Sequence, residues 1–116
     1  MHVAGMVHRN LDVLDAAARV SDDVGRLIDR SPRTLLHVRQ LRDSAQAIAA
    51  NIAEGFGRGT TRDRARLLRI ARGEAEEAIQ HLGANFRLHR ISTNDYWAIH
   101  HRLVVIVKMI NSFLSR

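Results

Sequence analysis

Apolar residues recur at intervals of three and four along most of the chain, which is the spacing of one face of an α-helix. Four stretches show this spacing, at residues 8–30, 32–55, 61–90 and 94–115, and none shows the sustained alternation of a strand. The residues expected to point inward, stretch by stretch, are Val7, Leu11, Leu14, Ala18, Val24, Leu27 and Ile28; Val38, Leu41, Ala45, Ile48 and Ile52; Leu68, Ala71, Ala75, Ala78, Leu82 and Phe86; and Tyr96, Ile99, Leu103, Ile106, Ile110 and Phe113. The pattern therefore predicts an all-α protein.

Helix-breaking and capping residues separate the four stretches. Ser31 is the expected N-cap of the second helix, with Pro32 at its first helical position. Three glycines between residues 55 and 59 end that helix, because glycine costs about 1 kcal/mol in a helix interior. Either Thr60 or Thr61 can cap the third helix. A capping box is expected before the fourth, in the run Ser92, Thr93, Asn94 and Asp95.

The short connections favour antiparallel packing of consecutive helices. We therefore expect one antiparallel up-down-up-down four-helix bundle, a single domain over residues 1–116. The chain has no Cys, so it offers no disulfide, thiolate metal site or Cys nucleophile. Aromatic residues make up only 4% of it, which argues against RNA-binding modules that stack bases. We see no signal peptide or membrane span, and we expect a soluble, cytoplasmic protein with no membrane partner.

The fourth helix carries a second apolar stripe beside its inward stripe. One interpretation makes this helix the most buried of the four within a monomer. The other makes the stripe a subunit interface, and we favour it because monomers rarely leave such a patch in water. The candidate interface residues are Trp97, Val104, Val107 and Leu114.

Positive charge is concentrated in one part of the chain. The formal net charge is +6, and Lys108 is the only Lys among the 18 basic residues. Residues 38–72 hold eight Arg against three acidic residues, a net charge of +5, whereas residues 1–37 sum to zero and residues 73–116 to +1. Such a cluster can bind phosphates without reading sequence, although an ordinary solvated helix face is the alternative. The candidate nucleic-acid-binding residues are Arg39, Arg42, Arg58, Arg62, Arg66, Arg69 and Arg72.

Enzymatic chemistry finds no support in the residue pattern. The glycines at 55, 57 and 59 do not form a phosphate-binding loop, because no strand precedes them and no Gly-Lys-Ser/Thr follows. His81 lies four residues after Glu77, whereas the carboxylate-bridged metal bundles use Glu-x-x-His. His100 and His101 point about 100° apart on a helix and cannot easily share a metal. We expect no catalytic residue, no metal and no cofactor.

Polar residues near the end of the second helix need partners. Asn51 and Glu54 flank Ile52 of the inward stripe. We expect the Asn51 side chain to form a hydrogen bond with the backbone or with a facing helix. We expect Glu54 to form an ion pair with Arg58 or with an arginine of the third helix. With Gly55 and Gly57 they form a predicted structural turn. A catalytic role for Glu54 is the weaker alternative.

A longer motif surrounds this turn. Its core is Asn51-Ile52-Ala53-Glu54-Gly55, preceded by Gln40-Leu41-Arg42-x-Ser44-Ala45 and followed by Gly57-Arg58 and, downstream, Leu68-x-x-Ala71-x-Gly73-x-x-x-Glu77. This pattern resembles a bacterial four-helix bundle family that includes the proteins encoded in intervening sequences of large-subunit ribosomal RNA genes. It is also similar to the accessory variability proteins of diversity-generating retroelements. The resemblance covers about residues 8–115.

This resemblance implies a homo-oligomer, a pentameric barrel, whose partners are RNA or DNA and, in the retroelement branch, a reverse transcriptase. It agrees with the arginine cluster found from the charge distribution. We therefore expect a non-catalytic, homo-oligomeric nucleic-acid-binding accessory protein. The alternative is a protein-interaction scaffold whose arginine cluster binds an acidic protein.

Overall fold

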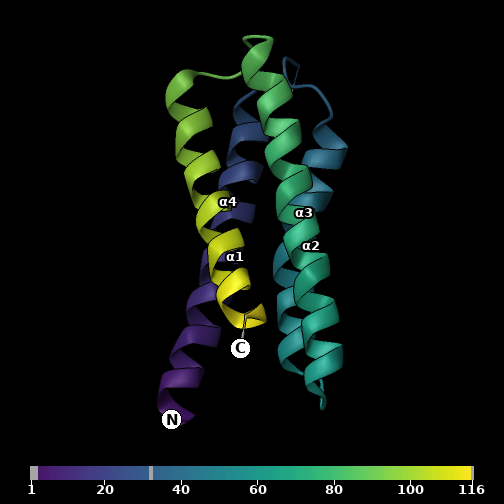
Figure 1. Ribbon diagram of the computed structural model, residues 1–116. Coiled ribbons are helices and arrows are strands. Elements are labelled where there is room, and N and C mark those ends of the chain that lie inside the picture. Colours follow the sequence, from purple (N-terminus) through teal and green to yellow (C-terminus); the bar gives the residue numbers. More distant parts are fainter. Residues whose placement is uncertain (1–2, 32, 116) are drawn as a thin grey trace.

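Four helices account for most of the chain in the computed structural model, which describes residues 3–31 and 33–115, with side chains from His8 onward. Successive helices alternate in direction (Figure 1), and the prediction of an all-α four-helix bundle is confirmed. The helices are α1 Val3–Arg30, α2 Val38–Phe56, α3 Thr61–Arg87 and α4 Thr93–Leu114.

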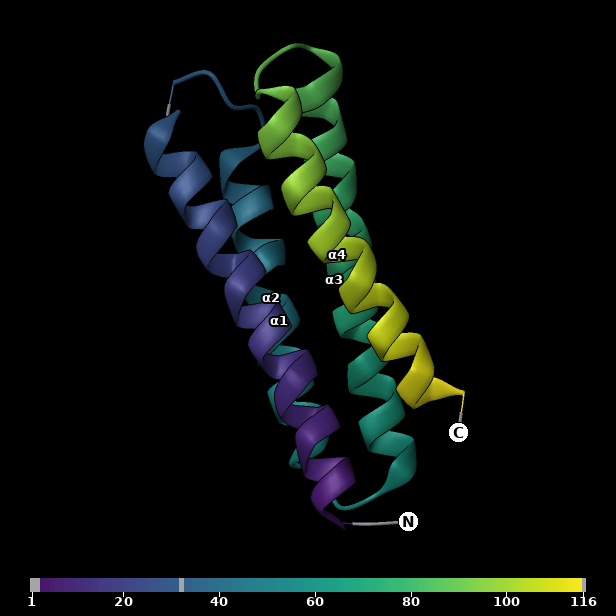
Figure 2. The same ribbon diagram turned by 90° about the vertical axis from the view of Figure 1, so that its left-hand side faces the viewer.

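The helices form a closed square. Each helix packs against its neighbours in the chain and α1 packs against α4, whereas in the described residues no Cα atoms of the diagonal pairs α1–α3 and α2–α4 come within 8 Å of each other. The bundle is elongated, with extents of 47 × 21 × 21 Å. The start of α1 and the end of α4 lie at the same end of the bundle as the α2–α3 turn (Figures 1 and 2).

The predicted inward stripes of the last three helices are confirmed, because their central residues are buried. Small residues dominate the core face of α3, where Ala71, Ala75 and Ala78 are fully buried. Aliphatic residues dominate the core face of α4, and Tyr96 and Phe113 pack partly buried at its two ends. The core is therefore built from Ala, Leu, Ile and Val, with the aromatic residues at its margins.

The inward stripe predicted for the first half of α1 is wrong. Leu11 is 57% exposed, Ala18 is exposed, Leu14 is half-buried, and Val7 falls among the residues whose side chains are not described. The residues that are buried instead continue the stripe of the second half backward at intervals of three and four: Val13, Ala17, Val20, Val24 and Leu27. The predicted stripe breaks this spacing after Ala18, so only the second stripe keeps one face toward the core along the whole helix.

The second helix begins later than predicted, at Val38 instead of residue 32. Ser31 is therefore not its N-cap; Pro32 lies outside the described residues, and the N-cap is His37 in the left-handed conformation, with φ 56°. Residues 33–37 are not helical, because this segment packs along the core, where Leu35 is only 8% exposed. The backbone of Leu36 is bonded to the side chain of Asn85 on α3.

A hydroxyl side chain caps the N-terminus of α3 and another caps the N-terminus of α4. The Thr60 hydroxyl accepts from the backbone N–H of Asp63 at 3.1 Å, and the Ser92 hydroxyl accepts from that of Asp95 at 3.1 Å, as predicted. α3 ends at Arg87, three residues before the expected 90, because His89 adopts a left-handed conformation with φ 56°. The backbone N–H of Arg90 then bonds back to the Asn85 carbonyl at 2.7 Å, which terminates the helix.

Candidate nucleic-acid interface

Three arginines share the solvent-facing side of α3 in its first three turns. Arg62, Arg66 and Arg69 are all exposed. Their spacing of four and three residues keeps them on one face, with rises of about 6 and 4.5 Å between them. Among the described residues, none of the three forms a hydrogen bond or an ion pair. We call these three residues the basic face of α3.

Four arginines of α1 and α4 have their charge compensated by an aspartate. Arg19 pairs with Asp15 at 2.9 Å, and Arg26 pairs with Asp23 at 2.8 Å. On the α1–α4 side, Arg30 pairs with Asp95 and Arg102 with Asp23. The basic face therefore differs from the arginines of α1 and α4 because its guanidinium groups are free to meet an external anion.

Two further predicted contact residues flank the basic face but are engaged. Arg58, in the α2–α3 turn, forms an ion pair with Glu54, which confirms one of the expected pairings. Arg72 is half-buried, and its Nη1 donates to the Asn111 Oδ1 of α4 at 2.8 Å. Arg72 follows Arg69 by three residues, a spacing that predicts it on the basic face, but its side chain is turned toward α4.

The remaining two predicted contact residues lie elsewhere. Arg39 and Arg42 are exposed in the first two turns of α2. Because α2 and α3 are antiparallel, this part of α2 lies beside the later turns of α3, where Nδ1 of His37 is 3.2 Å from Nδ1 of His81. Arg39 and Arg42 are thus separated along the bundle from the basic face.

The α2–α3 turn positions the basic face. Asn51 donates to the Ala47 carbonyl at 2.8 Å, so it bonds to backbone as predicted. Gly55 is buried, and a Cβ there would lie 3.3 Å from the Leu67 Cβ and 3.4 Å from the Arg64 carbonyl oxygen. Gly57 follows as the C-cap, with its N–H bonded to the carbonyls of the last turn of α2. Glycine at position 55 lets the two helices approach closely.

The second apolar stripe of α4 is only partly solvent-facing. Trp97 is 52% exposed and contacts the rings of Phe86, Tyr96 and His100. Val104 is half-buried. Val107 and Leu114 are also half-buried and pack against the core. The exposed part of the stripe therefore centres on Trp97 and Val104.

Asn85 is a key residue that the sequence reasoning missed. It is fully buried, accepts from the Leu36 N–H at 2.7 Å, and donates to the Leu36 carbonyl at 3.1 Å and the His81 carbonyl at 2.8 Å. A signal was present, because Asn85 follows Ala78 and Leu82 at core spacing. A polar residue at a core position requires a specific partner.

Two carboxyl groups have altered acidity. Burial raises the pKa of Asp23, but hydrogen bonds from Arg102 and Arg26 outweigh it and leave that pKa below its ordinary value. The pKa of Glu74 is raised by burial and by the nearby carboxylates of Glu77 and Asp43. These acidic side chains form no metal centre: in the part of the chain that the structure describes, no group of three or more His, Asp or Glu side chains could hold a metal ion.

None of the helices, within the described residues, is long and apolar enough to cross a membrane.

Fold and motif together define a class, the antiparallel four-helix bundle with a glycine-rich α2–α3 turn. The chain belongs to the 23S rRNA-intervening sequence protein family, whose model matches residues 9–112. A solved structure from the S23 ribosomal protein family of Bacteroides thetaiotaomicron, described as a protein with unknown function, superposes with a TM-score of 0.86 at 22% identity. The superposition covers 93% of this chain and 99% of that one, and at this identity it shows the fold alone. No match was found among proteins of curated function.

Proposed function

We propose that this protein is a non-catalytic RNA-binding accessory protein that contacts the phosphate backbone through the basic face of α3. The observation that carries the proposal is the set of three exposed guanidinium groups, Arg62, Arg66 and Arg69, which have no partner in the described part of the chain. Membership in a family encoded within ribosomal RNA genes favours RNA over DNA as the partner.

The chemistry of the basic face suits phosphate. Arginine offers a planar fork of donors that pairs with phosphate oxygens in a bidentate manner. Contacts of this kind position a protein on a nucleic acid without reading its bases. We therefore infer strongly salt-dependent binding with little sequence preference.

A fluorescence anisotropy titration with a labelled RNA hairpin tests the proposal, at several salt concentrations. Each phosphate contact contributes about 0.9 to the slope of log K against log[salt] on a duplex. The double variant Arg66→Glu/Arg69→Glu should weaken binding and lower that slope by about 2 per protomer, because two contacts are lost. A DNA duplex of matched sequence distinguishes RNA preference from general polyanion binding.

Arg87 provides the matched control. It is exposed on α3 without an ion-pair partner among the described residues, but it lies at the opposite end of the helix. Arg66→Glu and Arg87→Glu change the net charge equally. Binding that falls equally in both variants would show a diffuse charge effect and refute a local site. A specific acidic protein co-purifying through Arg66 and Arg69, with no RNA affinity, would favour the scaffold alternative.

We further propose that the protein self-associates through the outer side of α4. The exposed Trp97 and half-buried Val104 support this, since apolar side chains of this size at a surface favour contact with another copy. The family resemblance suggests a pentamer, and it also suggests a reverse transcriptase as a partner in the retroelement branch. Native mass determination tests the first suggestion, and co-purification with a reverse transcriptase tests the second.

A further inference from the structure

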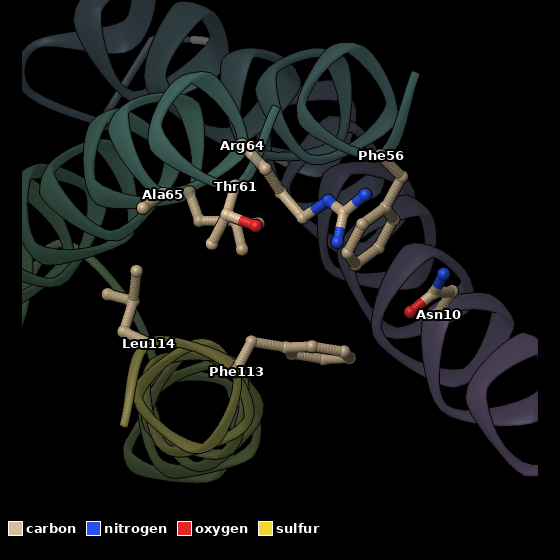
Figure 3. A pocket seen from close by; sticks show the side chains of 8 residues that line it. Asn10, Phe56, Thr61, Arg64, Ala65, Phe113 and Leu114 are labelled. Carbon is tan, nitrogen blue, oxygen red and sulfur yellow. The ribbon is translucent and has the colours of Figure 1, made fainter. Parts of the chain in front are cut away.

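A pocket of about 260 Å³ opens at the end of the bundle where α1 and α4 meet the α2–α3 turn (Figure 3). Most of its lining is apolar, with two aromatic rings, Phe56 of α2 and Phe113 of α4, whose centroids are 5.2 Å apart. Among the described residues, the lining also includes three polar side chains, Asn10, Thr61 and Arg64, and no acidic one.

Arg64 is the unusual member of this lining. Unlike the basic face, it is half-buried, and its Nε is buried without a hydrogen-bond partner among the described residues. It forms no ion pair there either. Figure 3 shows that Arg64, from α3, and Phe56, from α2, both line the pocket. The Nη groups of Arg64 also have no hydrogen-bond partner among the described residues, and they are the donors that an anion in the pocket can meet, because the Nε is shielded from solvent.

We propose that this pocket binds a small apolar carboxylate, with the carboxylate paired to Arg64 and the apolar body between the aromatic and aliphatic walls. The ligand would be an aryl or branched aliphatic acid of roughly the size of a benzene ring plus a short acid chain, since a cavity of about 150 Å³ already holds benzene. This site is separate from the basic face and does not depend on RNA binding.

The charge count favours a carboxylate over a phosphate. Arg64 is the only cationic residue among the described residues that line the pocket, and one guanidinium matches the single charge and two oxygens of a carboxylate. Thr61 and Asn10 supply further hydrogen-bonding groups at the rim. A phosphate dianion would need a second cation, and the pocket lacks one among the described residues.

The test is a titration with 3-phenylpropionate followed by methyl NMR of Leu68 and Leu114, both in the lining. We expect saturable shifts confined to the pocket, with a Kd of about 1 mM or tighter for a ligand of this size. The neutral alcohol 3-phenylpropan-1-ol, which keeps the apolar body, should bind at least about tenfold more weakly, because it lacks the charge-assisted pair.

Three variants locate the binding. Arg64→Met keeps an unbranched side chain without the charge and should weaken 3-phenylpropionate at least about tenfold while leaving the alcohol unchanged. Arg66→Met, the same change two residues along on the solvent-facing side, is the matched control, and it should bind 3-phenylpropionate as tightly as the unmodified protein does. Ala65→Phe should fill the pocket and abolish binding of both compounds.

Several outcomes would overturn the proposal. They are the absence of saturation up to about 20 mM acid, equal affinities for acid and alcohol in the unmodified protein, and equal losses in Arg64→Met and Arg66→Met. Tighter binding of phenyl phosphate than of 3-phenylpropionate would overturn the assignment to carboxylates. The comparison of acid with alcohol needs no variant, so a misfolded mutant leaves the proposal testable.

Discussion

Replacing Asn85 by Ala is expected to destabilise the bundle by releasing the α1–α2 connection. The Asn85 side chain satisfies both the N–H and the carbonyl of Leu36, at 2.7 and 3.1 Å. Its third bond, to the His81 carbonyl, matters less because that carbonyl lies within a helix. Each lost bond to a partly buried backbone group costs about 1–1.5 kcal/mol, and the better helix propensity of Ala returns about 0.5.

The net expectation is a loss of about 2 kcal/mol, or a decrease of roughly 8 °C in Tm for a domain of this size. Asn51→Ala is the matched control. Asn51 is half-buried in a helix and bonds only to a carbonyl of its own helix, Ala47. Its replacement should change the free energy of unfolding by less than about 0.5 kcal/mol.

Urea unfolding followed by circular dichroism at 222 nm measures both variants, at one protein concentration because self-association alters apparent stability. Hydrogen exchange adds a local readout, since the Leu36 amide should lose protection in Asn85→Ala. Equal free-energy changes for the two variants, or full protection of Leu36 in Asn85→Ala, would refute the role assigned to Asn85.

Three further predictions address packing, charge and assembly. Gly73→Ala should stabilise α3 by about 1 kcal/mol, because a Cβ there meets nothing within 4 Å. Gly55→Ala should lack this gain, because its Cβ would crowd Leu67, and equal urea midpoints of the two variants would contradict the close approach at Gly55. Folding lowers the pKa of Asp23, so the stability that its carboxylate contributes is present above the pKa of the unfolded state, near 3.8, and is lost as pH falls through the lower folded pKa. The unfolding free energies of wild type and Asp23→Asn should therefore converge toward pH 2. A difference that stays constant with pH would contradict the ion pairing. Val104→Asp should lower the mass of the protein in solution, and an unchanged mass by light scattering would exclude this face as the interface.

The helical periodicity predicts most of the fold, because a stripe at intervals of three and four selects one face wherever only one such stripe exists. In the last three helices the stripe centred on residues such as Leu41, Leu82 and Leu103 is buried as expected. In α1 two stripes interleave, and the sequence does not show which of Leu11 and Val13 faces the core until the neighbouring helices are placed.

The α1–α2 connection and the pocket depend on contacts between residues far apart in the chain. Ser31-Pro32 is a good local start for a helix, but burial of Leu35 and the bonds of Asn85 to Leu36 outweigh this preference. The charge pattern located the basic face. It did not single out Arg64, because only the packing of α3 against its neighbours shows that this side chain lines a pocket.

The seam between α1 and α4 joins the two helices that are furthest apart in the sequence, so its closure carries the largest chain-entropy cost in the bundle. Much of this seam is polar and partly exposed: Asp23 with Arg102, Arg30 with Asp95, and Arg9 with Ser112. Exposed ion pairs contribute little and weaken as salt screens them. We therefore expect native-state hydrogen exchange to show this seam opening before the rest of the bundle unfolds, at a rate that increases with ionic strength. The Arg64 pocket lies at one end of the seam and is lined by residues of both helices, so we expect opening of the seam to disturb this pocket as well.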